Sequence, residues 1–231
     1  QNIHCEEIPD RPNALKVIKR VNIFKTIEFK LGFFELQDAS SQLVAEFLDV
    51  NTKHKILDAC AGAGGKALHI ASLLNNKGNI IATDIHEFKL KELKKRARRN
   101  GIHNITTKVI DNKFLKKNKN KFDRVLIDAP CSGFGVIRRN PDSKWKLNPK
   151  DFNSILNDQI KILNDYSKLV NDNGIMLYVT CSIFPSENEK QIALFLNNEF
   201  GKNFKIIEEK KISPYDSGYD GFYLAKLKKK C

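Results

Sequence analysis

Short apolar runs alternate along the chain with stretches that have helical periodicity. Apolar runs without a helical period are typical of strands buried in a parallel sheet. We predict strands at residues 55–60, 79–84, 105–110, 122–128, 174–180, 204–208 and 221–227. Helical patterns lie around 43–48 and 68–74, and at 87–100, 151–171 and 187–197. This alternation predicts an α/β fold with a doubly wound, mostly parallel sheet.

Residues 1–35 have a different pattern and are interpreted as a short N-terminal extension. Residues 4–12 read as a loop, and apolar residues between 21 and 31 alternate with polar ones as in half-buried strands. The helix that follows should begin at Asp38 or Ser40, because both residue types cap helices. Residues 113–121, rich in Lys and Asn, read as a basic loop. We therefore predict one domain at 36–231, preceded by the extension. Because the first residue is Gln1 rather than Met, a fragment of a longer chain is an open alternative.

Composition narrows the class of protein. The net charge is +13, which favours a polyanionic partner, although a solvated lysine-rich surface would give the same number. The five cysteines are odd in number and widely spaced, and none forms a C-x-x-C pair. That usage argues against disulfides and against a metal site, and it favours the cytoplasm. No apolar run is long enough for a membrane span, so no membrane association is expected.

A glycine-rich turn follows the first predicted strand, at Gly62, Gly64 and Gly65. Glycine lets backbone N–H groups approach a ligand closely at the positive end of the next helix. Asp84 ends the next strand about 20 residues later, where an acid can bind ribose hydroxyls. The strict G-x-G-x-x-G spacing is absent, and Asp58 would repel a pyrophosphate but attract the cation of a methyl donor. The balance favours S-adenosylmethionine over a dinucleotide.

Two further residues near strand ends have two interpretations each. Lys66 follows the glycines and could bind a ligand carboxylate or merely balance charge. Asp111 ends the third strand and could accept a hydrogen bond from an adenine amine or cap the next element.

Two cysteines lie just beyond the ends of buried strands. Asp128 and Cys131 flank a proline after one strand, and Cys181 follows another. Ligands bind beyond the carboxyl ends of strands in open α/β sheets, so both thiols could face one pocket. The alternative is that Asp-Ala-Pro only turns the chain and the thiols fill gaps in the core.

A basic segment that contains an aromatic residue follows the first of these cysteines. It holds Arg138, Arg139, Lys144 and Trp145. Such a combination suits phosphate contact and base stacking, although Trp145 could equally be a core residue.

These motifs together resemble the RsmB/Nop/Sun family of RNA cytosine-5 methyltransferases. The segments that carry the resemblance are 36–42, 58–66, 128–133, 136–145, 180–182, 187–189 and 220–223. The resemblance implies a class I methyltransferase (Rossmann-like) fold with a seven-stranded sheet and an antiparallel C-terminal strand. It also implies S-adenosylmethionine as the donor, RNA as the substrate, and an upstream RNA-binding region of which residues 1–35 would be a remnant. We further expect a monomer. The donor site falls on Cys60, Ala61, Gly62, Ala63, Gly64, Gly65, Lys66, Asp84, Asp111 and Asp128.

The resemblance also implies separate roles for the two cysteines. Cys181 matches the nucleophile, and Cys131 matches a second cysteine that helps to release the product. Asp128 would hold the base near N3 and its amino group. The family usually has Ala-Pro where Gly62 and Ala63 stand and Thr where Ala67 stands, which bears on donor affinity.

We therefore expect an RNA cytosine-5 methyltransferase that acts on ribosomal RNA. One alternative is a DNA cytosine-5 methyltransferase, in which the cysteine after proline attacks the base. Another is a catalytically silent RNA-binding or ribosome-assembly protein that retains the fold.

Overall fold

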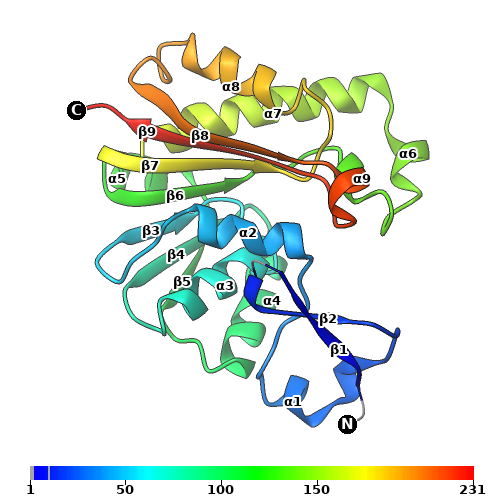
Figure 1. The fold of residues 1–231 in the computed structure, drawn as a ribbon. Helices are drawn as coiled ribbons and strands as arrows, with labels where there is room; N and C mark the ends of the chain where they lie inside the picture. The colour runs from blue at the N-terminus through cyan, green and yellow to red at the C-terminus, as the bar shows by residue number, and fades with distance from the viewer. Residues whose placement is uncertain (1–2, 10) are drawn as a thin grey trace.

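The computed structural model describes residues 3–9 and 11–231 and is built around a seven-stranded sheet of order β5-β4-β3-β6-β7-β9-β8 (Figure 1). Its strands are β3 (Lys55–Asp58), β4 (Asn79–Asp84), β5 (Ile105–Val109), β6 (Phe122–Asp128), β7 (Val170–Thr180), β8 (Phe204–Ile212) and β9 (Phe222–Lys229). The pairs from β5 through β7 are parallel, whereas β9 is antiparallel to both β7 and β8. The predicted doubly wound sheet with an antiparallel C-terminal strand is confirmed.

Alternate residues of the central strands point to opposite faces of the sheet, as the two-residue period of a strand requires. In β6, Val125 and Ile127 join one buried cluster, whereas Leu126 joins the other. β7 repeats this pattern, with Met176 in the first cluster and Leu177 in the second. Both faces of the sheet are therefore covered by apolar layers.

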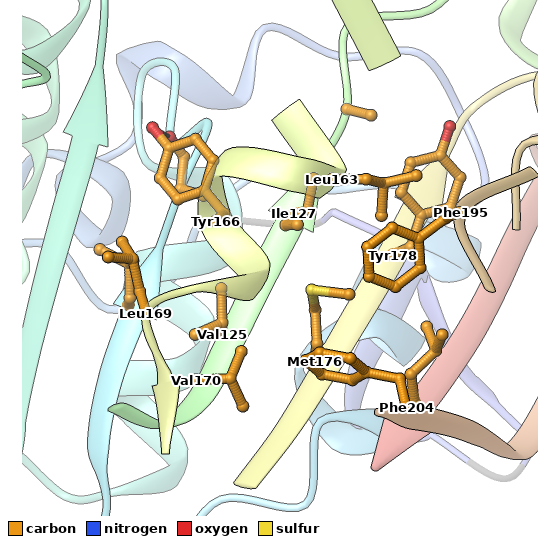
Figure 2. Packing of buried hydrophobic residues seen from close by; sticks show 14 of the residues in the cluster. Val125, Ile127, Leu163, Tyr166, Leu169, Val170, Met176, Tyr178, Phe195 and Phe204 are labelled. Atoms are coloured by element: carbon orange, nitrogen blue, oxygen red, sulfur yellow. Dashed lines mark hydrogen bonds between the residues drawn. The ribbon is translucent and has the colours of Figure 1, made fainter. Parts of the chain in front are cut away.

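Helices cover these two faces. One face is packed by α5 (Asn112–Lys117), α7 (Pro149–Ser167) and α8 (Glu189–Leu196). Figure 2 shows Leu163 of α7 and Phe195 of α8 packed beside Met176 and Tyr178 of β7. The other face carries α2 (Ala39–Phe47), α3 (Gly65–Leu73) and α4 (Glu87–Arg99). Beyond the N-terminal extension, the remaining helices are short: α6 (Ser143–Lys146), α9 (Pro214–Ser217) and the 3-10 turn η2 (Phe134–Val136).

The N-terminal extension differs from the prediction. Within the described residues, the predicted loop at 4–12 contains β1 (Cys5–Ile8) and the start of β2 (Arg11–Val17), which form an antiparallel hairpin. Residues 1, 2 and 10 of the extension lie outside the described part. The predicted strands at 21–31 are also wrong, because the chain forms η1 (Ile23–Lys25) and α1 (Ile27–Lys30). Thr26 caps α1 by accepting a hydrogen bond from the backbone N–H of Phe29, which outweighs the apparent alternation.

Other helix boundaries differ from the prediction because of capping and strand pairing. The predicted loop at 113–121 begins with α5, since Asp111 accepts a hydrogen bond from Phe114 N at 2.6 Å and Phe114 is buried. The helix predicted to reach residue 171 ends at Ser167, because Val170 already pairs with Phe122 in the sheet. Asp38 is the N-cap of α2, as predicted.

Across the described residues, no helix has both the length and the apolar character that crossing a membrane requires.

Candidate functional site

A cavity of about 940 Å³ opens at the carboxyl ends of β3, β4, β6 and β7. Open α/β sheets bind ligands at this edge. Many of the residues predicted for the site line the cavity, namely Cys60, Gly62, Lys66, Asp84, Asp111, Asp128, Cys131, Arg139 and Cys181. The structure therefore brings the predicted donor site and both cysteines into one space.

The glycine-rich turn between β3 and α3 forms one wall. Gly62 and Gly64 have φ values of 54° and 90°, in the left-handed region that favours glycine. A Cβ at Gly64 would lie 2.4 Å from Cγ of Leu93, so α4 packs directly on this turn. A Cβ at Gly62 would meet nothing within 4 Å, which leaves space beside the backbone there. The turn thus needs glycine for its conformation at both positions and for close packing at Gly64.

Asp84 fixes the same turn from the end of β4. Its Oδ2 accepts a hydrogen bond from Gly62 N at 2.9 Å, and its Oδ1 accepts one from His86 N at 2.8 Å. A carboxylate offers about four acceptor positions, so Asp84 can still accept from ligand hydroxyls. Asp111 caps α5 and also lines the cavity, so both interpretations of that residue agree with the structure.

Lys66 and Asp128 form an ion pair across the cavity, with 2.6 Å between Nζ and Oδ2. Burial lowers the pKa of Lys66, but the adjacent Asp128 carboxylate outweighs burial and raises the pKa above its usual value. Asp58, at the end of β3, is fully buried, and neither of its carboxylate oxygens has a hydrogen-bond partner among the described residues. Burial, reinforced by the Asp128 charge, raises the pKa of Asp58 to about 7. The wall of the cavity therefore holds a charged lysine paired with Asp128, whereas Asp58 is buried and does not line the cavity.

The two cysteines meet at the edge of this cavity. Sγ of Cys131 lies 3.3 Å from Sγ of Cys181. The hydrogen bond from Cys131 lowers the pKa of Cys181, against the effect of burial, and the charge of Lys66 lowers it further. The same hydrogen bond, together with burial, raises the pKa of Cys131 well above its usual value. Cys181 is therefore the more readily ionised thiol, and the thiolate is the nucleophilic form.

Cys60 differs from this pair. Burial raises the pKa of its thiol above the usual range, so Cys60 stays protonated at neutral pH. It lines the cavity as a neutral side chain.

Two polar residues that support the site were not predicted as site residues. Tyr166 of α7 lines the cavity and donates a hydrogen bond to the carbonyl of Ala59 at 3.0 Å. Glu187 is fully buried beneath the cysteines and accepts hydrogen bonds from Ser132 and Ser182. Glu187 lies in the segment 187–189 that contributes to the family resemblance. Its partner Ser132 is distant in the sequence, so the sequence does not predict this contact.

Several predicted donor-site residues do not line the cavity. They are Ala61, Ala63, Gly64 and Gly65, whose backbone instead forms the turn and the start of α3. Gly65 lines a separate, smaller cavity beside the N-terminal extension.

The predicted substrate-binding residues divide into two pairs. Arg139 forms an ion pair with Asp220, which is buried, and Arg138 donates a hydrogen bond to the carbonyl of Gly218 at 2.5 Å. These two arginines therefore hold the segment after β6 against the loop before β9. Trp145 is 80% exposed, with Lys144 Nζ at 4.9 Å from its ring centroid. The core alternative for Trp145 is thus wrong, and the pair faces solvent outside the cavity.

The residues of the cavity suit S-adenosylmethionine. The open backbone at Gly62, the Asp84 carboxylate and the charged Lys66 offer partners for a hydroxylated, zwitterionic and cationic ligand. In the described part of the chain, no group of three or more His, Cys, Asp or Glu residues could hold a metal ion.

Comparison with known proteins agrees with this geometry. A sequence model of the family described as 16S rRNA methyltransferase RsmB/F matches residues 45–228. The chain belongs to this family. The match also makes S-adenosylmethionine the cofactor of the domain, and the class I methyltransferase fold is confirmed.

Individual relatives show how far the similarity extends. The chain is 37% identical to the "Probable ribosomal RNA small subunit methyltransferase B" of Bacillus subtilis, over 100% of this chain and 55% of the relative. It is 36% identical to "Ribosomal RNA small subunit methyltransferase B" of Yersinia enterocolitica, over 95% of this chain and 52% of the relative. The chain thus spans about half the length of these relatives.

Solved structures resemble the whole chain. The crystal structure of PH0851 matches with a TM-score of 0.92 at 31% identity, over 98% of this chain and 54% of that one. The structure of NSun6 from Pyrococcus horikoshii with SFG matches with a TM-score of 0.83 at 27% identity, over 94% and 59%.

Proposed function

We propose that this chain is the catalytic core of an RNA cytosine-5 methyltransferase that modifies small-subunit ribosomal RNA. The observation that carries the proposal is the pair of thiols, with 3.3 Å between Cys131 Sγ and Cys181 Sγ, at the edge of the donor cavity. Cytosine C5 is too electron-poor to attack a methyl group directly. A nucleophile that adds to C6 makes C5 electron-rich, and a thiolate suits this addition.

The donor site is assigned to the glycine turn and the acids beside it. The turn around Gly62 would hold the methionine part with the help of Lys66, and Asp84 would accept hydrogen bonds from the ribose hydroxyls. S-adenosylmethionine supplies an electrophilic methyl group when bound. These residues orient the donor within the cavity that also holds the two thiols.

Cys181 is assigned as the nucleophile. Its lowered pKa makes the thiolate available, and its sulfur adds to C6 of the target cytosine. In a DNA-type enzyme the cysteine after proline attacks, and the Cys181 thiol, 3.3 Å from Cys131 Sγ, would have no role, which argues against that alternative. The presence of both cysteines and Asp128 in the donor cavity argues against a catalytically silent protein, which has no need of these residues there.

Release of the product is assigned to Cys131. Once C5 carries the methyl group, Cys181 is bound to C6 as a thioether and its charge no longer holds the proton on Cys131. Cys131 loses that proton to solvent and, as a thiolate, takes the C5 proton, and the electron pair of that C–H bond expels the Cys181 sulfur from C6 as a thiolate. Asp128 would accept a hydrogen bond from the cytosine amino group while it holds Lys66, since a carboxylate has about four acceptor positions. The target base must leave its stack to reach this pocket.

The exposed Lys144 and Trp145 are proposed to contact the RNA beside the target base. A cation for the phosphate and an aromatic face for a base are the usual elements of such a contact. The net charge of +13 also supports an RNA partner, because lysine and arginine side chains neutralise phosphates.

Transfer of labelled methyl groups tests this function. The protein is incubated with methyl-labelled S-adenosylmethionine and small-subunit ribosomal RNA, and the digested nucleosides are separated. We expect the label in 5-methylcytidine and its loss in a Cys181→Ala variant. Label in another nucleoside would refute the cytosine-5 assignment, and donor binding without any transfer would favour the silent RNA-binding protein.

A further inference from the structure

Glu187 lies between β7 and α8, directly beneath the two cysteines, and its side chain is fully buried. One carboxylate oxygen accepts hydrogen bonds from Ser132 N at 2.7 Å and from Gln159 Nε2 at 3.0 Å. The other accepts hydrogen bonds from Ser132 Oγ at 2.5 Å and from Ser182 Oγ. A buried carboxylate is tolerated when it is bonded in this way, and such charge-assisted bonds are stronger than neutral ones.

The partners of Glu187 are the residues that follow the cysteines. Ser132 is next to Cys131 on the segment after β6, and Ser182 is next to Cys181 on the segment after β7. One carboxylate therefore ties together two segments whose cysteines are 50 residues apart in the chain. Asn188 strengthens one side, because it accepts a hydrogen bond from Thr180 Oγ1 at 2.5 Å and donates one to the carbonyl of Ser182 at 3.0 Å.

We propose that Glu187 is a positioning residue that holds Cys131 and Cys181 at hydrogen-bond distance, so that one thiol activates the other. Glu187 is not assigned contact with substrate or donor, and it acts through Ser132 and Ser182. The catalytic meaning of this role rests on the proposed function, whereas the effect on the thiols does not.

The direction in which the pKa of Cys181 changes when Glu187 is removed distinguishes a positioning role from a purely electrostatic one. The charged groups that act on the thiol pair are Lys66 of α3, Asp128 of β6, Arg139 after η2, and Glu187 itself. Removal of the Glu187 charge alone would make both thiols easier to ionise. Loss of the Cys131–Cys181 hydrogen bond would instead make Cys181 harder to ionise, because that bond is the main cause of its lowered pKa.

Two substitutions at this position test the proposal. Glu187→Ala removes the side-chain links, whereas Glu187→Gln removes the charge but can keep the links, because serine hydroxyls can accept as well as donate. Glu189→Gln is the matched control, since Glu189 is two residues away and its Oε1 accepts a hydrogen bond from the exposed Lys211 at 2.6 Å rather than from the segments that carry the cysteines. The readouts are kcat and KM for methylation of ribosomal RNA, and the pH midpoint of Cys181 alkylation by iodoacetamide, resolved by mass spectrometry.

We expect Glu187→Ala to lower kcat by about 100-fold, the loss typical of a misplacement near 1 Å, with KM for RNA unchanged. The alkylation midpoint of Cys181 should rise in this variant. The kcat of Glu187→Gln should stay within about tenfold of the original value, and the kcat of Glu189→Gln should equal the original value. Equal losses in Glu187→Gln and Glu187→Ala, or a midpoint that falls or does not move in a Glu187→Ala protein that still binds S-adenosylmethionine, would overturn the proposal.

A further variant keeps the test valid if Glu187→Ala does not fold. Ser182→Ala removes the link from Glu187 to the Cys181 side, together with the hydrogen bonds of Ser182 Oγ to Ser132 Oγ and Phe184 N. It leaves the carboxylate paired with Ser132 and Gln159, and it should also raise the Cys181 midpoint. An unchanged midpoint there would overturn the proposal. Should the protein methylate no cytosine at all, the proposed function fails, but the alkylation midpoints still decide whether Glu187 positions the thiols.

Discussion

Asp58 should make the fold less stable as the pH rises. Its carboxyl group is fully buried at the end of β3, without a hydrogen-bond partner among the described residues. Burial raises its pKa from 3.8 to about 7 in the folded state. The folded protein therefore holds a proton that the unfolded chain releases, so this group destabilises the fold progressively between about pH 4 and pH 7.

The size of the effect follows from the shift. A difference of about three pKa units corresponds to on the order of 4 kcal/mol, of which about 2.5 kcal/mol falls between pH 5 and pH 8. Asp58→Asn removes this titration. Between pH 5 and pH 8 the original protein should therefore lose about 2.5 kcal/mol more of its free energy of unfolding than the variant does. Urea denaturation at both pH values, without donor, measures this difference.

A matched control uses an acid at the surface. The side chain of Asp142 is 79% exposed, and Asp142→Asn should show no such dependence on pH. The reasoning is refuted if Asp58→Asn and the original protein lose stability in parallel between pH 5 and pH 8.

Three further substitutions probe the donor site, the segment after β6 and the proposed RNA surface. Asp84→Ala should weaken S-adenosylmethionine binding in calorimetry by about 1–3 kcal/mol, because it removes the acceptors for ligand hydroxyls and the hydrogen bond from Gly62 N. Unchanged affinity would show that Asp84 is not part of the site. Arg139→Ala should lower the free energy of unfolding by about 2 kcal/mol, because it leaves Asp220 buried and unpaired. Trp145→Ala should leave stability unchanged and weaken RNA binding by about 1–3 kcal/mol, and the opposite pattern for these two variants would show that their roles are exchanged.

The sheet could be predicted from the sequence because its signals are local. The apolar strands are bounded by charged or glycine-rich turns, and their order along the chain alternates with helices. The cavity followed from the same logic, since Asp84, Asp128 and the two cysteines all lie at strand ends that a parallel sheet brings to one edge.

What the sequence could not show depends on contacts between distant segments. Glu187 bonds Ser132 across 55 residues, and Arg139 pairs with Asp220 across 81, so neither partnership has a local signal. In the extension, the alternation of apolar residues resembled a strand, but the Thr26 cap decided for a helix. The segment 113–121 shows the converse. Its high charge is typical of a loop, but its buried residue Phe114 anchors a helix.

The central claim is that Cys181 attacks the base and Cys131 releases it. The most direct test incubates each alanine variant with ribosomal RNA and S-adenosylmethionine and looks for covalent protein–RNA adducts on a denaturing gel. The account predicts that Cys131→Ala accumulates an adduct, because C5 keeps its proton and the Cys181 sulfur cannot leave, whereas Cys181→Ala forms none. An adduct that persists in Cys181→Ala and vanishes in Cys131→Ala would contradict the account.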